Sequence, residues 1–242
     1  MSIIQALINA STGAILIKLD LEAVRDRETN VGSNRRERRF KLRGGVVCLD
    51  FVNTVGSRLT DRHSEYLRSY EDLLDWARQV GLLSPEETEG LFRQAALDPE
   101  GAQETLSRAL ALREAIHRVI SRAIASESQD ESDLSVLNRE LSIALSHLRV
   151  MPSGGAYGWD WDLSGDDGGA RLDGPLWPVA QSAAELLTSP KLGRVKVCAG
   201  EGCGWMFLDE SRNNSRLWCD SRDCGNRERV RRHLARKRAS GS

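Results

Sequence analysis

The sequence carries the stretch Cys198-Ala-Gly-Glu-Gly-Cys203 and, fifteen residues further on, the stretch Cys219-Asp-Ser-Arg-Asp-Cys224. Thiolates suit zinc, which binds four ligands at the corners of a tetrahedron. Two ligands close in sequence can share one metal only where the backbone turns sharply, and glycines in and after the first pair permit such a turn. The spacing therefore predicts one Zn²⁺ bound by Cys198, Cys203, Cys219 and Cys224.

Because four thiolates leave no open coordination position, the predicted zinc is structural rather than catalytic. The alternatives are two disulfides or four free thiols. Secreted disulfide scaffolds are usually shorter, with cysteines spread through them, whereas four of the five cysteines here fall in the last quarter of the chain. A reducing, cytoplasmic setting fits this pattern better. No apolar run is long enough to span a membrane, and residues 3–21 lack the basic start of a signal peptide.

The segment between the two pairs has the pattern of a β-hairpin. Residues 205–209 and 216–218 are predicted strands, with a turn over 211–215. The predicted order is therefore knuckle, hairpin, helix, as in a treble-clef module. A module this short buries too little apolar surface to fold without a metal. Its predicted core consists of three aromatic side chains: Trp205, Phe207 and Trp218.

An arginine-rich helix is predicted from Asn226 onward, with Val230 and Leu234 as a narrow apolar stripe that packs on the hairpin. From residue 191 to 242 there are 13 Lys and Arg against 6 Asp and Glu, whereas the whole chain has a net charge of -1. Such crowded cations repel one another unless anions are near, and arginine binds phosphates bidentately. The predicted nucleic-acid contacts are Arg212, Arg216, Arg227, Arg229, Arg231, Arg232, Arg236 and Arg238.

Three alternatives remain for this helix. It could be a solvated helix whose cations favour the helix dipole. It could bind an acidic protein partner on a zinc scaffold, or it could bind RNA, because nothing in the pattern distinguishes DNA from RNA. Preference for arginine over lysine favours nucleic acid over mere solubility.

The rest of the chain predicts a mainly helical domain with a small antiparallel sheet, which makes the fold class α+β. Residues 44–54 form a predicted buried strand, and helices are expected to begin after Ser69, at Ser84 with a capping box, and after Asp98. A further helix spans about 132–148, a hairpin covers 148–163 and a last helix covers 175–188. The expected domains are a poorly ordered extension (1–39), the helical domain (40–189) and the zinc module (190–242).

The helical domain is the candidate for an input function. Polar Asp50 and Asn53 fall in an otherwise apolar stretch, and together with Trp177 they could line a pocket for a small effector. The more economical interpretation makes the tryptophan a core residue and the two polar side chains caps of nearby backbone. No enzyme is expected, because the four histidines are scattered and the sequence has neither a nucleophile elbow nor a phosphate loop.

The string Cys224-Gly-Asn-Arg227, with Cys198-Ala-Gly-Glu-Gly-Cys-Gly-Trp205 before it and a basic helix behind it, resembles the CGNR zinc-finger family. The preceding region is similar to the ABATE domain, on Gly44 to Thr54 and on Leu176-Trp-Pro-Val-Ala180. The resemblance covers about residues 40–238. It implies a bacterial transcription regulator induced by stress, with the finger as its DNA-binding part. It also implies the metal role of the four cysteines.

Overall fold

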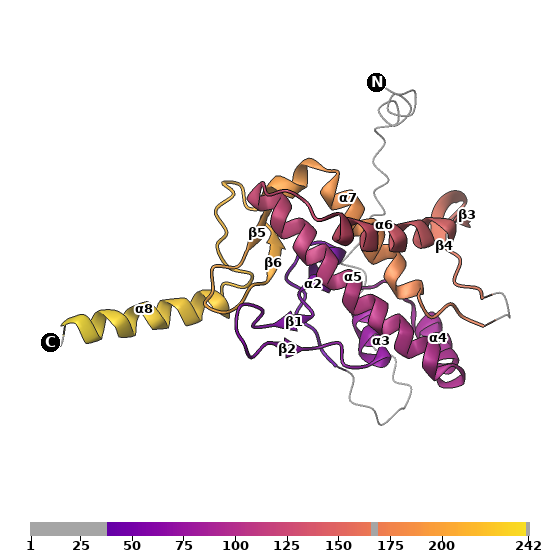
Figure 1. The fold of residues 1–242 in the computed structure, drawn as a ribbon, viewed down its shortest axis with the longest axis horizontal. Helices are drawn as coiled ribbons and strands as arrows, with labels where there is room; N and C mark the ends of the chain where they lie inside the picture. The colour runs from indigo at the N-terminus through magenta and orange to yellow at the C-terminus, as the bar shows by residue number, and fades with distance from the viewer. Residues whose placement is uncertain (1–37, 166–168, 241–242) are drawn as a thin grey trace, which may run out of the picture. The chain divides into compact units, whose positions relative to one another are not determined.

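The computed structural model describes residues 38–165 and 169–240, and the side chains as far as residue 238. These residues form one compact unit. The predicted extension over residues 1–39 lies almost wholly outside the described residues. Figure 1 shows the short helix α2 (Val47–Val52) in the middle of this unit, with α8 (Cys224–Ser240) running away from the other helices.

The stretch predicted as a buried strand is instead a short helix, α2 (Val47–Val52), with Asn53 at its C-terminal end. Four of its six residues are buried, because it is contacted by α7 (Trp177–Leu187), α5 (Pro99–Ala125) and β6 (Met206–Leu208). A short apolar run has no periodicity that separates a buried strand from a buried helix. Its surroundings, rather than the β-branched residues in it, decide the outcome.

The three following helices begin where the sequence predicts. They are α3 (Tyr70–Gln79), α4 (Pro85–Leu97) and α5 (Pro99–Ala125). At the start of α4, Glu87 N donates to Ser84 Oγ over 3.1 Å, and Ser84 N donates to Glu87 Oε2 over 2.7 Å, which completes the capping box. Leu112, Ile116 and Ile120 of α5 are fully buried against the rest of the core.

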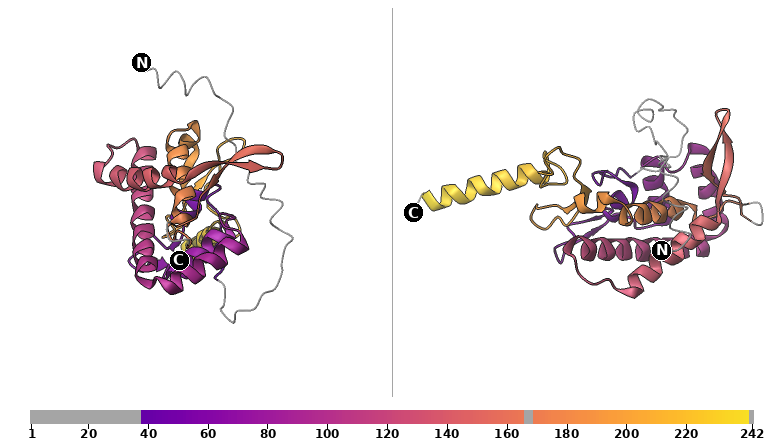
Figure 2. Two further views of the ribbon diagram at one scale, coloured as in Figure 1. Left: turned by 90° about the vertical axis from the view of Figure 1, so that its right-hand side faces the viewer. Right: turned by 90° about the horizontal axis from the view of Figure 1, so that it is seen from above.

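Two short sheets and two helices complete the helical domain, which is called the body below (residues 38–189). These are β1 (Val55–Gly56) paired with β2 (Ser64–Glu65), α6 (Glu131–Ser146), the hairpin β3 (Leu148–Ser153) and β4 (Ala156–Trp161), and α7 (Trp177–Leu187) after the 3-10 helix η1 (Gly174–Leu176). Both sheets are antiparallel, so the predicted α+β class is confirmed. Figure 2 shows the β3–β4 hairpin extending beyond the helices.

The zinc module follows the 3-10 helix η2 (Pro190–Arg194) and has a different hairpin from the one predicted. Strand β6 (Met206–Leu208) pairs with β5 (Val195–Val197), which precedes the first cysteine, so the first knuckle connects the two strands. Residues 216–218 form no strand. Arg216 folds inward instead, as described below. Helix α8 (Cys224–Ser240) begins at the last cysteine.

The two predicted domains share one hydrophobic core. Val195, Met206 and Leu208 of the zinc module belong to the same buried cluster as α2, α3, α5 and α7. A second, smaller cluster contains the four cysteines, Trp205 and Phe207, with Trp218 half-buried at its side. The zinc module therefore packs against the body through shared core residues, and this packing fixes how the module is oriented on the body.

Candidate metal centre and basic helix

The four cysteine side chains come together as the spacing predicts. Their Sγ atoms all lie within 4.8 Å of one another, and all four residues are buried. The Sγ of Cys219 is 3.8 Å from that of Cys203 and 3.6 Å from that of Cys224. A disulfide needs an S–S distance near 2.05 Å, whereas four sulfurs about 2.3 Å from a tetrahedral zinc are about 3.8 Å apart. The cluster therefore fits zinc and not two disulfides.

The backbone around the first pair supports thiolate ligands. Gly200 N and Cys219 N donate to the Sγ of Cys198 over 3.4 and 3.3 Å. Hydrogen bonds from the Cys203 and Cys219 thiols, together with these two N–H groups, lower the pKa of Cys198. Donors to sulfur stabilise the charged form, which is the form that binds metal.

Two glycines allow the knuckle, the turn that carries Cys198 and Cys203, to pack against the body. Gly202 and Gly204 have φ values of +70° and +69°, which glycine adopts without strain. A Cβ on Gly202 would lie 2.7 Å from Thr60 Cγ2, and one on Gly204 would lie 2.9 Å from Leu59 Cγ. The turn between β1 and β2 thus lies directly against the knuckle.

Arg227 joins the metal centre to the basic helix. Its Nη2 donates to Cys224 Sγ over 3.0 Å, and its Nε lies 3.2 Å from Asp223 Oδ1. Lys41 Nζ also contacts Asp223, over 2.7 Å, so a segment of the body reaches the second cysteine pair. A guanidinium next to a thiolate stabilises the negative charge that zinc binding requires.

Beyond Glu228, every described side chain of α8 is exposed as far as Arg238. Glu228 is buried and pairs with two arginines: Arg231 Nε over 2.9 Å and Arg232 Nε over 2.8 Å. Val230 and Leu234 are 51% and 49% exposed, so the prediction that they pack on the hairpin is wrong. Figures 1 and 2 both show α8 extending away from the body.

Arg216 is the predicted phosphate contact that the fold uses internally. Its guanidinium donates to the backbone oxygens of Trp218 and Cys219 and lies 4.2 Å from the centre of the Phe207 ring. Its own N–H donates to Asp209 Oδ2 over 2.9 Å. Arg212 on the same loop is exposed and makes no ion pair with a described residue.

A buried carboxylate, missed by the sequence reasoning, organises this loop. Asp209 is fully buried, and Lys196 Nζ lies 2.6 Å from its Oδ2. Burial alone would raise its pKa, but hydrogen bonds from Lys196, Ser211 and Arg216 outweigh burial and lower it. The carboxylate therefore stays charged and fixes the chain between β6 and the second cysteine pair.

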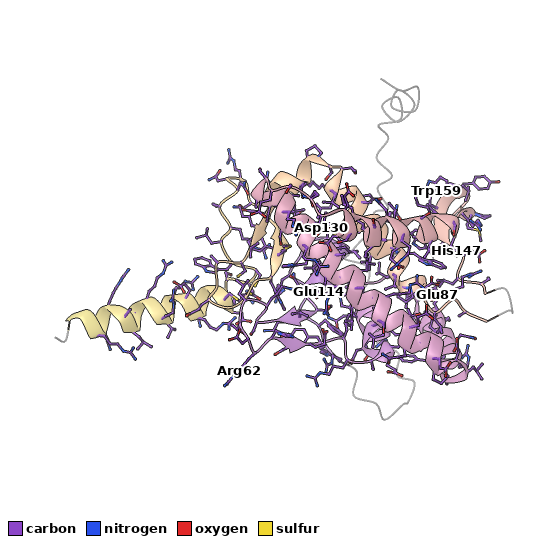
Figure 3. The ribbon with its side chains drawn as sticks, in the orientation of Figure 1. Arg62, Glu87, Glu114, Asp130, His147 and Trp159 are labelled. Carbon is purple, nitrogen blue, oxygen red and sulfur yellow. The ribbon has the colours of Figure 1, made fainter. Side chains whose placement is uncertain are left out.

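Contacts between body and knuckle were also missed, because their partners are far apart in sequence. Arg58 N donates to Cys203 O over 3.1 Å, and Trp205 Nε1 donates to Val55 O over 2.7 Å. The Arg58 side chain then reaches Glu114 on α5, with 2.5 Å between Nη1 and Oε2. Figure 3 labels Glu114 at this central position. No local pattern in the sequence points to these contacts.

The three residues proposed for an effector pocket have separate roles. Asp50 Oδ1 accepts from Gly44 N over 2.7 Å, and burial raises the pKa of this carboxyl to about 6. Asn53 binds the backbone of Met206. Trp177 is 1% exposed and stacks on His147, with 4.4 Å between ring centres. Their contacts support the alternative interpretation of caps and core.

Two family models match the chain, one over the body and one over the zinc module. The ABATE family model, described as "Putative stress-induced transcription regulator", matches residues 45–190, more than half of the chain. The chain belongs to the ABATE family. A second model, the CGNR zinc finger, matches residues 194–237. No curated protein matches the sequence.

In this ABATE protein the CGNR match contains the whole metal centre, from Cys198 to Cys224, and most of α8. The zinc module, called the finger below (residues 194–237), holds one structural zinc, with the four cysteines as ligands. Arg227, the last residue of the CGNR string, is the one that contacts the Cys224 sulfur. None of the described helices is both long and apolar enough to cross a membrane.

Proposed function

We propose that this ABATE protein is a transcription regulator that binds duplex DNA through α8 and the adjoining surface of the finger. The observation that carries the proposal is an exposed cationic helix whose first turn is tied to the zinc ligands. The tie consists of Cys224, which is both ligand and first residue of α8, and Arg227, which contacts its sulfur. Such a helix has a fixed direction from the body.

The distribution of charge on α8 suits a groove rather than a flat surface. At about 100° per residue, the arginines fall on opposite sides of the helix: Arg227, Arg231 and Arg238 on one, and Arg229, Arg232 and Arg236 on the other. The major groove of B-DNA admits one α-helix and has phosphates along both walls. A helix with cations on two sides can therefore contact both walls at once.

The exposed arginines differ in whether a carboxylate already pairs with the guanidinium that would bind phosphate. Arg229 and Arg238 make no ion pair with another described residue, whereas Arg231 and Arg232 share Glu228. A bound phosphate would have to compete with this carboxylate. We therefore assign Arg229 and Arg238 the largest share of phosphate binding, and we assign no base contact.

Measuring affinity against salt tests this mechanism. Each phosphate contact releases counterions, so the logarithm of the binding constant should fall with the logarithm of salt, with a slope of about -0.9 per contact. Replacing Arg229 with Gln should weaken binding to any duplex sequence and make the slope shallower by about one contact. The full-length zinc-loaded protein and a fluorescent random-sequence duplex serve for this measurement.

Arg93→Gln is the matched control. Arg93 lies on α4, is also exposed, and among the described residues it pairs with Glu89, one turn away, over 3.5 Å. The control should bind like the wild type. The DNA proposal fails if affinity hardly changes with salt, or if the α8 variant and the control bind equally well.

A zinc-scaffolded protein-interaction module is the second candidate. Val230 and Leu234 favour it, because two exposed apolar residues four positions apart form a stripe on which a partner helix could pack. An acidic partner would then meet the arginines. Replacing both residues with Ser should leave DNA affinity unchanged if the helix binds phosphate, and should abolish partner binding in the second case. Competition between the duplex and a structured RNA tests the third possibility, RNA binding.

The remaining parts of the proposal follow from the family. We propose that the protein is bacterial and responds to stress, and that it acts in the cytoplasm, where reducing conditions leave thiolates available for zinc. The body serves in assembly or in sensing a small effector, and no catalytic role is assigned to it. Turnover of a substrate by the full-length, zinc-loaded protein would contradict the last point.

A further inference from the structure

A cavity of about 610 Å³ lies where the body meets the finger. One part of its lining comes from residues 38–41, from Gly56 and Ser57, and from Tyr66 and Arg68 of the body. The finger contributes the other part, including Trp205, the rims of the cysteine cluster and Arg227 at the start of α8. The cavity is therefore distinct from the exposed length of α8.

The lining is rich in cations. It contains five of them (Arg38, Arg39, Lys41, Arg68 and Arg227) against two carboxylates, Glu201 and Asp223. A zinc ion with four thiolates adds two negative charges, so the surroundings keep a net positive charge. Arg227 offsets part of the thiolate charge directly, because it is hydrogen-bonded to Cys224 Sγ. Concave surfaces with one sign of charge concentrate ions of the other sign.

Three groups in this lining have donors without a partner among the described residues. The Arg39 side chain makes no ion pair or hydrogen bond there, and Arg68 uses only its Nε, which donates to Glu65 O over 3.1 Å. The Tyr66 hydroxyl makes no hydrogen bond either, although its ring is half-buried beside the cysteine cluster. Two guanidinium groups and a phenol thus present several N–H and O–H donors to one cavity.

The backbone that lines the cavity is constrained at two positions. Ser57 has a φ of 52°, which is uncommon for a residue with a side chain and is found where a site constrains the chain. A Cβ on Gly56 would clash with the Tyr66 hydroxyl, so a larger residue there would displace the phenol. The cavity shape is therefore set by backbone that tolerates little change.

We propose that this cavity is a phosphate-binding site, with Arg39 and Arg68 as its principal ligands and the Tyr66 hydroxyl as an additional donor. Phosphate matches this set because its oxygens accept from several guanidinium donors at once. The phosphate can belong to a small phosphorylated molecule or to the backbone of bound DNA. The second source rests on the function proposed above, whereas the first does not.

The site is coupled to the finger through Arg227 and Asp223. Asp223 already forms ion pairs with Lys41 over 2.7 Å and with Arg227 over 3.2 Å, so these two cations are held at the edge of the cavity. A phosphate that draws either cation away from Asp223 changes a contact at the first turn of α8.

Titration of the zinc-loaded full chain with adenosine 5′-monophosphate tests the first source, with adenosine as the uncharged comparison. Binding is followed by isothermal titration calorimetry at low salt. We expect the monophosphate to bind and adenosine not to bind, and Arg68→Gln and Arg39→Gln each to weaken binding by about tenfold, the usual loss for a charged hydrogen bond. Both residues are exposed, so these variants should fold normally. Arg93→Gln is the control.

Duplex DNA forms the second arm, with the same variants. If the phosphate belongs to DNA, Arg39→Gln and Arg68→Gln weaken DNA binding and make its salt dependence shallower, while the monophosphate does not bind. The proposal is overturned if both variants match Arg93→Gln in both arms. That result is distinct from failure of the proposed function, because Arg229→Gln reports on α8 independently.

Discussion

The Nη2 of Arg227 lies 3.0 Å from the Sγ of Cys224 and donates a hydrogen bond to it. One arginine of the basic helix therefore belongs to the metal centre. This contact gives a physical reason for an arginine at this place in the CGNR string: a guanidinium stabilises the thiolate from outside the coordination sphere.

Replacing Arg227 with Gln should therefore weaken zinc binding by about tenfold or more, the usual effect of losing a partner of a metal ligand. Competition with a chromophoric zinc chelator measures it. Arg229→Gln removes an equal charge two residues away, where no sulfur is contacted, and should keep wild-type zinc affinity. Equal affinities for the two variants would show that the contact does not support the metal.

Asn53 connects α2 to β6 through two side-chain hydrogen bonds. Its Nδ2 donates to Met206 O over 2.8 Å, and Met206 N donates to its Oδ1 over 2.9 Å. Asn53→Ala leaves two buried backbone groups without partners, which should lower the free energy of unfolding by about 2–4 kcal/mol. Urea unfolding measures this loss. Asn138→Ala, at an exposed position of α6, should lower the free energy of unfolding far less. A similar loss for both variants would contradict a stabilising role of the Asn53 hydrogen bonds.

Asp50 should make stability depend on pH. Burial raises the pKa of this carboxyl from 3.8 to about 6, against the opposing hydrogen bonds from the Gly44 and Arg43 backbone. Between these values the folded protein holds a proton that the unfolded chain has lost, so stability falls as pH rises through this window.

The measurement is the free energy of unfolding of the wild type minus that of Asp50→Asn, followed from about pH 4 to pH 7. This difference should decrease by up to about 3 kcal/mol, since one pKa unit corresponds to about 1.4 kcal/mol. Both proteins have the same zinc site, so its own pH dependence largely cancels. A difference that stays constant, or increases with pH, would exclude the raised pKa.

Removal of zinc should destabilise the body as well as the finger. Val195, Met206 and Leu208 contribute to the main core, and the knuckle accepts hydrogen bonds from the β1–β2 turn. Chelation should lower the melting temperature of the helical domain by about 10 °C, given a few degrees for each kcal/mol lost in a domain of this size. Circular dichroism at 222 nm follows the transition. A body that melts at the same temperature with and without zinc would mean that the finger is an independent appendage.

Much of this protein could be predicted from local sequence. Capping depends on residues within one turn, so Ser84 and Glu87 predict the start of α4 without knowledge of the fold. The hairpin at 148–161 follows from its Gly-Gly turn and the alternating pattern around it. The metal ligands follow from residue type and short spacing, because zinc restricts both the chemistry and the geometry of its ligands.

The errors concern contacts between distant segments. The stretch around Phe51 is a helix because three elements bury it, and Arg216 faces Phe207 because Asp209 holds the loop inward. Neither relationship leaves a periodic pattern. The pairing of β6 with β5 rather than with residues 216–218 likewise depends on where the body holds each segment.

The amino-acid sequence alone therefore determined the zinc ligands, the starts of α3, α4 and α5 and the cationic character of the last helix, because each depends on neighbouring residues and their chemistry. Tertiary structure decided which arginines are exposed, which carboxylates neutralise them and how the finger is attached to the body. Those outcomes depend on burial and on partners such as Asn53 and Met206, which lie 153 positions apart and meet only when the chain has folded.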